Sequence, residues 1–154
     1  MGAPRDIHGA CVAVGEAGVL LRGPSGSGKS ALALALIETA RVRGLFARLV
    51  ADDRVVLGAV HGRLVARPHP GLAGLVEERG VGIVPVPHLP AVVVRLVVDL
   101  AFAPERLPER SEVVLEGIAL PLCTLPAGRT PAETVLRRLG TLAGCGRVPT
   151  IVTY

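Results

Sequence analysis

Residues 23–30, Gly-Pro-Ser-Gly-Ser-Gly-Lys-Ser, have the types and spacing that hold the phosphates of a nucleotide. This segment, called the P-loop below, fits the pattern G-x-x-x-x-G-K-[ST] in full. Its glycines let backbone N–H groups turn toward phosphate oxygens, and a following helix adds a favourable dipole. Lys29 brings a mobile positive charge to the outer phosphates, and the Ser30 hydroxyl is a ligand for Mg²⁺. A glycine-rich turn without a ligand is the alternative. The residues predicted to contact nucleotide are Gly23, Pro24, Ser25, Gly26, Ser27, Gly28, Lys29 and Ser30.

Two adjacent carboxylates, Asp52 and Asp53, follow the apolar run 46–51. In parallel α/β sheets, ligands bind beyond the carboxyl ends of strands, so this pair is expected near the P-loop. Because side chains alternate along an extended chain, one carboxylate would face a metal ion and the other a substrate hydroxyl. Phosphoryl transfer to an alcohol requires such a carboxylate beside the hydroxyl. An ordinary acidic turn is the alternative, and Asp99, at the end of a later apolar run, is a rival acid that ranks lower.

Apolar runs that alternate with helical patterns predict an α/β fold with some antiparallel pairs. The helix after the P-loop is expected over residues 29–43, which are rich in Ala and Leu and stop near Gly44. A short helix is expected over 71–79. A last helix is expected with Thr130 as its N-cap, Pro131 at the first helical position and Glu133 completing a capping box. Strands are expected over 19–22, 46–51, 82–86 and 91–99, a hairpin over 55–57 and 63–66, and an antiparallel edge over 113–116 and 118–122.

Length and composition exclude several classes of protein. The chain has 154 residues, which favours one domain, and half of them are apolar, which excludes intrinsic disorder. Three aromatic residues are too few for a surface that stacks nucleic-acid bases. The net charge is +4, but no block of Lys and Arg exceeds two residues, so neither nucleic acid nor a membrane is an expected partner. Three cysteines without metal-ligand spacing and the lack of a secretory signal pattern favour the cytoplasm.

Four segments occur in an order that resembles the catalytic domain of the HPr kinase/phosphorylase family. They are His8-Gly9, the P-loop, Leu-Val-Ala-Asp-Asp at 49–53, and Leu-Val-Glu-Glu-Arg-Gly-Val-Gly-Ile-Val at 75–84. The last contains the family pattern of Glu, one variable residue and Arg-Gly-Leu-Gly-Ile-Ile, with Val81 in place of Leu. The resemblance extends over residues 7–140. It implies a P-loop kinase domain of the HPr kinase/phosphoenolpyruvate carboxykinase-like type, with a mixed sheet and flanking helices, as a single domain over 1–154. An N-terminal domain that many members carry is expected to be absent, as in the short alphaproteobacterial form.

The resemblance also implies an activity. Members use ATP and Mg²⁺ to phosphorylate a serine of the phosphocarrier protein HPr, and they use inorganic phosphate to remove that group, releasing pyrophosphate. HPr is therefore the expected partner, a homo-oligomer (a hexamer in the family) is the expected assembly, and regulation of the phosphotransferase system is the expected role.

Residue roles carried over from the family concern the carboxylates and the P-loop first. Asp53 matches the base that takes the serine proton and acts as the acid in dephosphorylation. Asp52 would support the metal ion or orient that base. Ser30 and Glu77 match Mg²⁺ ligands, and Lys29 neutralises phosphate charge.

Three further residues are assigned by the same resemblance. His8 matches a family histidine upstream of the P-loop. Arg79 is expected to meet an acidic or phosphorylated group of the partner, because a guanidinium pairs with phosphate in a bidentate fashion. Arg129 is the candidate for a late catalytic arginine.

Three departures from the family pattern support the inference of dephosphorylation less than that of phosphorylation. Ala31 stands where members usually have an acidic residue, Leu125 stands where a second basic residue is expected, and residues 41–44 form an extension. Two other functions therefore stay open: a P-loop kinase of a small hydroxylated metabolite such as free serine, with a closed substrate pocket, and a non-catalytic nucleotide-dependent module. Phosphate transfer to HPr or to free serine distinguishes them.

Overall fold

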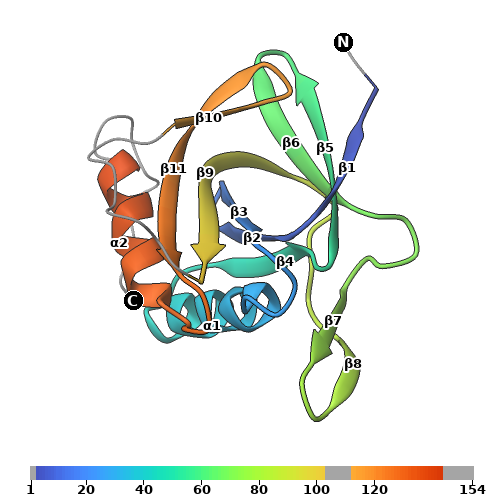
Figure 1. The fold of residues 1–154 in the computed structure, drawn as a ribbon, viewed down its shortest axis with the longest axis vertical. Helices are drawn as coiled ribbons and strands as arrows, with labels where there is room; N and C mark the ends of the chain where they lie inside the picture. The colour runs from blue at the N-terminus through green and yellow to red at the C-terminus, as the bar shows by residue number, and fades with distance from the viewer. Residues whose placement is uncertain (1–2, 103–111, 144–154) are drawn as a thin grey trace.

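The computed structural model describes residues 3–102 and 112–143 (Figure 1). Within these ranges the chain forms two helices and eleven strands. In chain order they are β1 (Arg5–His8), β2 (Ala10–Val14), β3 (Ala17–Arg22), α1 (Lys29–Val42), β4 (Ala47–Ala51), β5 (Arg54–Val60), β6 (Arg63–Pro68), β7 (Leu75–Glu78), β8 (Gly82–Pro85), β9 (Val92–Ala101), β10 (Glu112–Leu115), β11 (Ile118–Pro126) and α2 (Ala132–Ala143).

The large sheet is mixed, and its strand directions determine where a ligand site forms. Its order is β1-β5-β6-β9-β3-β2-β4, with β11 added beside β9 and β10 beside β11. β3, β9 and β11 are parallel neighbours. β4 runs in the same direction as β3, because both are antiparallel to β2. The carboxyl ends of β3, β4, β9 and β11 therefore lie at one edge of the sheet, which is where ligands bind in α/β proteins.

The sheet forks at β9. The first part of β9, at Val92 and Val93, pairs with β6. Its last part, residues 97–101, pairs with β11. Since β3 occupies the other side of β9, β6 and β11 share one side and diverge. One branch then continues through β5 and β1 and the other through β10, and the two branches diverge from β9 (Figure 1).

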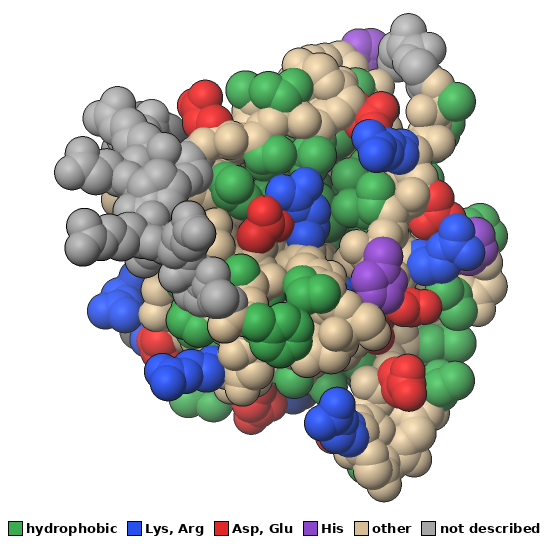
Figure 2. Space-filling model, in the orientation of Figure 1, with side chains coloured by type: hydrophobic (Ala, Val, Ile, Leu, Met, Phe, Trp, Pro, Cys, Tyr) green, Lys and Arg blue, Asp and Glu red, His purple; other side chains and the backbone are tan. Residues whose placement is uncertain are grey.

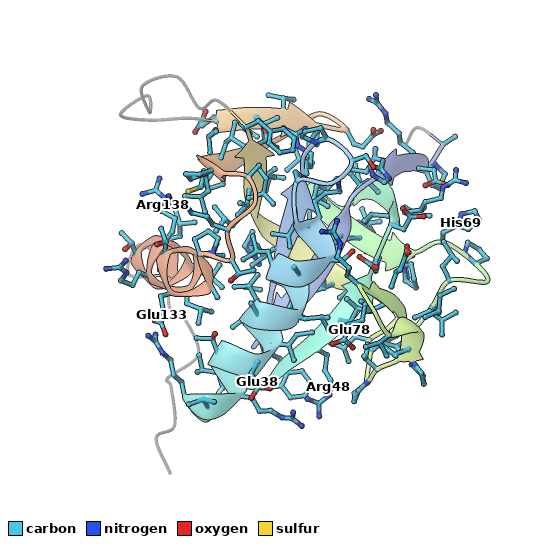
Figure 3. The ribbon with its side chains drawn as sticks, turned by 60° about the horizontal axis from the view of Figure 1, so that its bottom comes forward. Glu38, Arg48, His69, Glu78, Glu133 and Arg138 are labelled. Carbon is cyan, nitrogen blue, oxygen red and sulfur yellow. The ribbon has the colours of Figure 1, made fainter. Side chains whose placement is uncertain are left out.

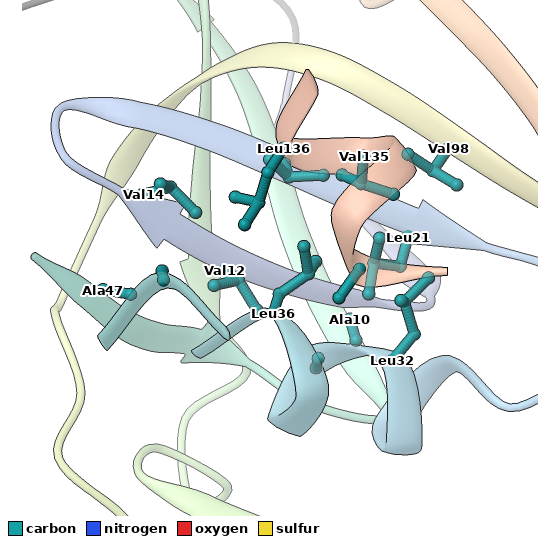
Figure 4. Close-up of a cluster of buried hydrophobic side chains, with 14 of the residues drawn as sticks. Ala10, Val12, Val14, Leu21, Leu32, Leu36, Ala47, Val98, Val135 and Leu136 are labelled. Atoms are coloured by element: carbon teal, nitrogen blue, oxygen red, sulfur yellow. The ribbon is translucent and has the colours of Figure 1, made fainter. Parts of the chain in front are cut away.

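Each face of the sheet carries its own apolar core. α1 and α2 cover one face, where helix and strand side chains interdigitate (Figure 4). The residues labelled there are Ala10, Val12, Val14, Leu21, Leu32, Leu36, Ala47, Val98, Val135 and Leu136. The other face curves around a second cluster, which includes Leu20, Leu57, Leu64 and Val97, with Leu115 packed against it. The alternation of side chains along each strand thus supplies both cores.

Most predicted elements are confirmed. The helix after the P-loop ends at Val42, close to the expected Arg43. The last helix begins at Ala132, one residue later than predicted. The Pro131 carbonyl oxygen accepts the first helical bond, from the Val135 N–H, so Pro131 and not Thr130 is the N-cap residue. The four predicted strands are present as β3, β4, β8 and β9, and β10 pairs with β11 as expected. The β5–β6 hairpin is also present, with a tighter turn at His61-Gly62, where both residues have positive φ.

The helix predicted over residues 71–79 is wrong. Residues 75–78 form β7, which pairs with β8 in a separate two-stranded hairpin. Gly71, Gly74 and Gly80 all adopt positive φ, so a right-handed helix cannot pass through them. The stretch between Gly74 and Gly80 is too short to nucleate a helix by itself.

The strands β1 and β2 were not predicted. β2 is buried along its whole length, and its sequence Ala-Cys-Val-Ala-Val is a continuous apolar run. Such a run is typical of a strand covered on both faces. Within the described part of the chain, neither helix has the length and apolar character needed to cross a membrane.

Stability is expected to depend on the helix-covered core. Leu36 of α1 is fully buried, so Leu36→Ala should lower the free energy of unfolding by about 2–5 kcal/mol. Val42 on the same helix is 80% exposed, and Val42→Ala should change the free energy of unfolding by no more than about 0.5 kcal/mol. Urea denaturation of both variants measures the difference. Equal effects would contradict this account of the core.

Candidate functional site

The P-loop connects β3 to α1, and two of its glycines are required by the backbone. A Cβ on Gly23 would lie 2.8 Å from the carbonyl oxygen of Leu100 and 2.7 Å from Ser27 Oγ, which is closer than side chains tolerate. Gly28 caps α1 with φ 98°, and its carbonyl oxygen accepts the first helical bond, from the Leu32 N–H. The loop is therefore a tight turn that ends at a helix N-terminus, the arrangement that binds phosphate.

Lys29 lies inside the P-loop. Its Nζ donates to the carbonyl oxygens of Gly23, at 2.9 Å, and Pro24, at 3.0 Å, and the residue is 7% exposed. Burial lowers the pKa of Lys29, while the negative charges of Asp52 and Asp53 act in the opposite direction. This ammonium group has lost much of its water, so a phosphate oxygen within reach gives it a strong partner.

Asp52 connects three segments of the site. It follows β4 directly and is 4% exposed. Its Oδ1 accepts a hydrogen bond from Ser30 Oγ at 2.7 Å, and its Oδ2 accepts one from the Glu77 N–H at 3.4 Å. The carboxylate thus joins the start of α1, the end of β4 and the strand β7.

Asp53 has the opposite environment, because its side chain is 64% exposed. Its Oδ1 lies 3.4 Å from His8 Nδ1. The expectation that Asp52 and Asp53 diverge along an extended chain is wrong in its geometry: Asp53 has φ 67°, in a tight turn where the Arg54 N–H donates to the Asp52 carbonyl oxygen. The Gly9 N–H holds this turn by donating to the Asp53 carbonyl oxygen at 3.0 Å. The conformation costs about 1–3 kcal/mol, and such strain gathers at functional sites.

The remaining candidates lie on two further segments. Glu77 belongs to β7, and its backbone N–H donates to Asp52. Arg79 is an exposed residue of the turn between β7 and β8. Arg129 is exposed in the loop before α2, and that loop packs on the P-loop, because the Gly128 N–H donates to the Ser27 carbonyl oxygen at 3.0 Å. Figure 3 shows Glu78 of β7 on one side of α1 and Glu133 of α2 on the other.

Asp99, the rival acid, is engaged elsewhere. Arg22 Nε donates to Asp99 Oδ1 at 2.8 Å, and Arg22 Nη2 donates to Oδ2 at 2.9 Å. The two residues are direct partners in the β3–β9 register. No sequence signal pointed to Arg22, because pairing across parallel strands depends on register. The ranking of Asp52 and Asp53 above Asp99 stays a prediction.

The donor atoms at Asp52 suit magnesium. Ser30 Oγ and Asp52 Oδ1 are hard oxygen ligands that lie together beside the P-loop. The described residues contain no group of three or more His, Cys, Asp or Glu that would form an all-protein cage. Mg²⁺ commonly needs none, because it keeps several waters and binds one or two carboxylates together with phosphates.

A phosphate-binding loop whose serine contacts a carboxylate at the end of a nearby strand is typical of P-loop kinases. The chain belongs to the family described as "HPr Serine kinase C-terminal domain", which matches residues 1–95. The resemblance inferred from the motifs, and the mixed α/β fold, are thereby confirmed.

Relatives and a solved structure support this assignment. The chain is 41% identical over 83 residues to the HPr kinase/phosphorylase of Clostridium tetani, covering 54% of this chain and 25% of that protein. It is 44% identical over 85 residues to the HPr kinase/phosphorylase of Streptococcus thermophilus, covering 54% and 26%. The matches thus span about a quarter of these curated relatives. The HPr(Ser) kinase/phosphatase structure from Coxiella burnetii superposes with a TM-score of 0.75 at 26% identity, covering 92% of this chain and 99% of that one.

The strained turn predicts an unusual stability pattern at Asp53. Glycine adopts positive φ freely, whereas alanine does not, so Asp53→Gly should be about 1 kcal/mol more stable than Asp53→Ala. Thermal unfolding of the two variants measures this difference. An alanine variant as stable as the glycine variant would show that the turn at Asp53 is unstrained.

Proposed function

We propose that the chain is the catalytic part of a protein serine kinase/phosphorylase that transfers the γ-phosphoryl group of ATP to a serine of HPr. The relatives are named HPr kinase/phosphorylase, and the similar solved structure is named an HPr(Ser) kinase/phosphatase. The observation that carries the proposal for this chain is the pairing of a buried and an exposed carboxylate beside the P-loop. Asp52 contacts the P-loop serine, whereas Asp53 is open to an incoming hydroxyl.

The residues divide the work as follows. Backbone N–H groups of the P-loop and Lys29 bind the phosphates, and Asp53 accepts the proton of the acceptor serine. The serine oxygen then bonds to the γ-phosphorus, and the bond to the bridging oxygen breaks with ADP as leaving group. In the phosphate-dependent direction, an oxygen of inorganic phosphate bonds to the phosphorus of phosphoserine. The serine oxygen leaves with the proton held by Asp53, and pyrophosphate forms.

His8, Asp52 and Ser30 position these groups. His8 Nδ1 lies 3.4 Å from Asp53 Oδ1, so we assign to His8 the orientation of that carboxylate. Ser30 and Asp52 would hold Mg²⁺, with Glu77 added when its exposed side chain turns inward. When bound, Mg²⁺ offsets the negative charge of the phosphates. Arg129, in the loop on the P-loop, is the residue we assign to the charge that develops on the transferred group.

Exposure favours a protein acceptor over a small metabolite. Asp53 is 64% exposed, whereas a metabolite kinase needs a closed substrate pocket. The β7–β8 hairpin projects from the body of the molecule beside α1 (Figure 1). Its apolar residues Val81 and Ile83 are exposed, and Arg79 lies between the two strands. We assign this hairpin to contact with HPr. Assembly into a homo-oligomer remains part of the proposal on the family resemblance alone.

Phosphate transfer from labelled ATP tests the function directly. HPr and free serine are offered in parallel, and label is expected on HPr. Lys29→Ala is the matched control, because removal of the one lysine of the chain should abolish transfer while circular dichroism stays unchanged. Label on free serine alone would replace the proposal with a metabolite kinase. Label on neither acceptor, with ATP bound, would favour a non-catalytic module.

The role of Asp53 predicts a separation of rate from binding. Asp53→Asn keeps the size of the side chain but removes the base, so the rate of transfer to HPr should fall by about 10²–10⁴-fold. ATP affinity, measured by calorimetry, should change little, since Asp53 lies on the acceptor side of the loop. Weakened ATP binding with a near-normal rate at saturation would instead make Asp53 a ligand of the metal–nucleotide complex.

A further inference from the structure

An open hollow of about 170 Å³ lies where the sheet forks. Figure 2 shows this face, with charged side chains at the floor of the hollow and hydrophobic side chains around them. Its walls come from β1 and β5 on one branch and from β10 and its turn on the other. The lining residues are Arg5, Ile7, His8, Arg22, Leu57, Leu115 and Glu116.

The hollow continues the core face that the helices do not cover. Leu57 belongs to that core cluster, and Ile7 and Leu115 pack against it. At the floor, Arg22 is the last residue of β3 and immediately precedes the P-loop. The hollow therefore opens beside the phosphate-binding site, at the edge where the parallel strands end.

His8 places the hollow on the acceptor side of the reaction. This histidine lines the hollow, and its Nδ1 lies 3.4 Å from Asp53 Oδ1. A hydroxyl group that reaches Asp53 thus arrives next to the rim of the hollow. The loop before α2 packs on the P-loop, because the Gly128 N–H donates to the Ser27 carbonyl oxygen. None of the residues that line the hollow belongs to that loop or to α2. An incoming protein therefore reaches the hollow and Asp53 from the same side.

The chemistry of the hollow suits an apolar group. Arg22 is neutralised by its two hydrogen bonds to Asp99, and Arg5 and Glu116 bring opposite charges to the lining, so the hollow offers no net charge to a ligand. Ile7 and Leu115, which are half-buried, supply the apolar contact, and Leu57 is buried beside them. A cavity of roughly 150 Å³ holds one benzene-sized group, whereas sites for whole small molecules begin at about 300 Å³.

We propose that this hollow binds one large apolar side chain of the acceptor protein, close in space to the serine that receives the phosphate. The inference rests on the proposed function, because it assigns to the hollow a part of the same protein substrate. It makes the fork of the sheet a determinant of specificity for the acceptor.

Filling the hollow tests the proposal. Leu115→Trp should occupy the space and raise the KM for HPr about 10- to 100-fold, the factor expected when one Leu-sized side chain is no longer buried. Val114→Trp is the matched control on the same strand, because Val114 is 65% exposed and outside the lining, and its KM should stay within a factor of two. ATP affinity should be unchanged in both variants.

Arg5→Trp narrows the hollow from the opposite wall. It is the second test of the proposal if Leu115→Trp does not fold. Arg5 is exposed on the edge strand β1, so this change does not disturb either core. It should also raise the KM for HPr. Replacing, one at a time, the large apolar side chains near the acceptor serine of HPr by Ala should raise the KM of the unmodified enzyme. One of these alanine replacements should raise the KM with the unmodified enzyme but not with the Leu115→Trp variant. That replacement identifies the side chain that occupies the hollow.

The outcomes separate this inference from the proposed function. If the unmodified chain phosphorylates HPr and both tryptophan variants in the hollow match Val114→Trp, the hollow is not a binding site and the proposed function stands. If the two variants weaken ATP binding instead, the hollow holds part of the nucleotide and the inference is overturned. If the unmodified chain never phosphorylates HPr, both proposals fail together.

Discussion

The hydrogen bond from Ser30 Oγ to Asp52 Oδ1 is the contact on which the arrangement of the site depends. A buried carboxylate is costly unless polar groups pair with it. At Asp52 those partners are the Ser30 hydroxyl and the Glu77 N–H. The hydrogen bonds to this one carboxylate therefore hold the start of α1 and the strand β7 against the end of β4. The same contact brings the hydroxyl and carboxylate oxygens together as a pair of hard ligands. The atoms that stabilise this region are therefore the same atoms that we propose as Mg²⁺ ligands.

The next residue, Asp53, keeps an exposed side chain because the buried contacts are made by Asp52. The turn that separates the two carboxylates has a positive φ at Asp53 and is held by Gly9 N–H. One side chain consequently points into the protein and the other into solvent. The link to Gly9 also fixes the end of β1, which carries His8 to within 3.4 Å of the exposed carboxylate. A strained turn is thus stabilised by the segment that supplies the neighbouring histidine.

The part of the site that we assign to the nucleotide could be predicted from the sequence, whereas much of the part that we assign to the acceptor could not. The P-loop and the helix after it depend on local preferences: glycines at a tight turn, and Ala and Leu over residues 29–42. Arg22–Asp99 and His8–Asp53 depend on which strands become neighbours, and no periodicity records that. The segment 71–79 shows the limit most clearly, since glycines with positive φ overrode its helical pattern. Family resemblance recovered Glu77 and Arg79 as candidates, but it gave no indication of the hairpin that carries them.

In the proposed function, the fork at β9 would let one sheet serve two partners of different kinds. Parallel pairing of β3, β9 and β11 gathers three strand ends at one edge, where backbone N–H groups and a helix dipole suit an anion. Antiparallel pairing of β6 with the first part of β9 directs the other branch away and leaves apolar side chains facing across a gap. Arg22 and Asp99 stand at the junction, with one charge neutralising the other. Because that pair is satisfied internally, neither charge is left free toward the P-loop or the hollow, so in the proposed function the phosphates and the apolar side chain would not compete for Arg22.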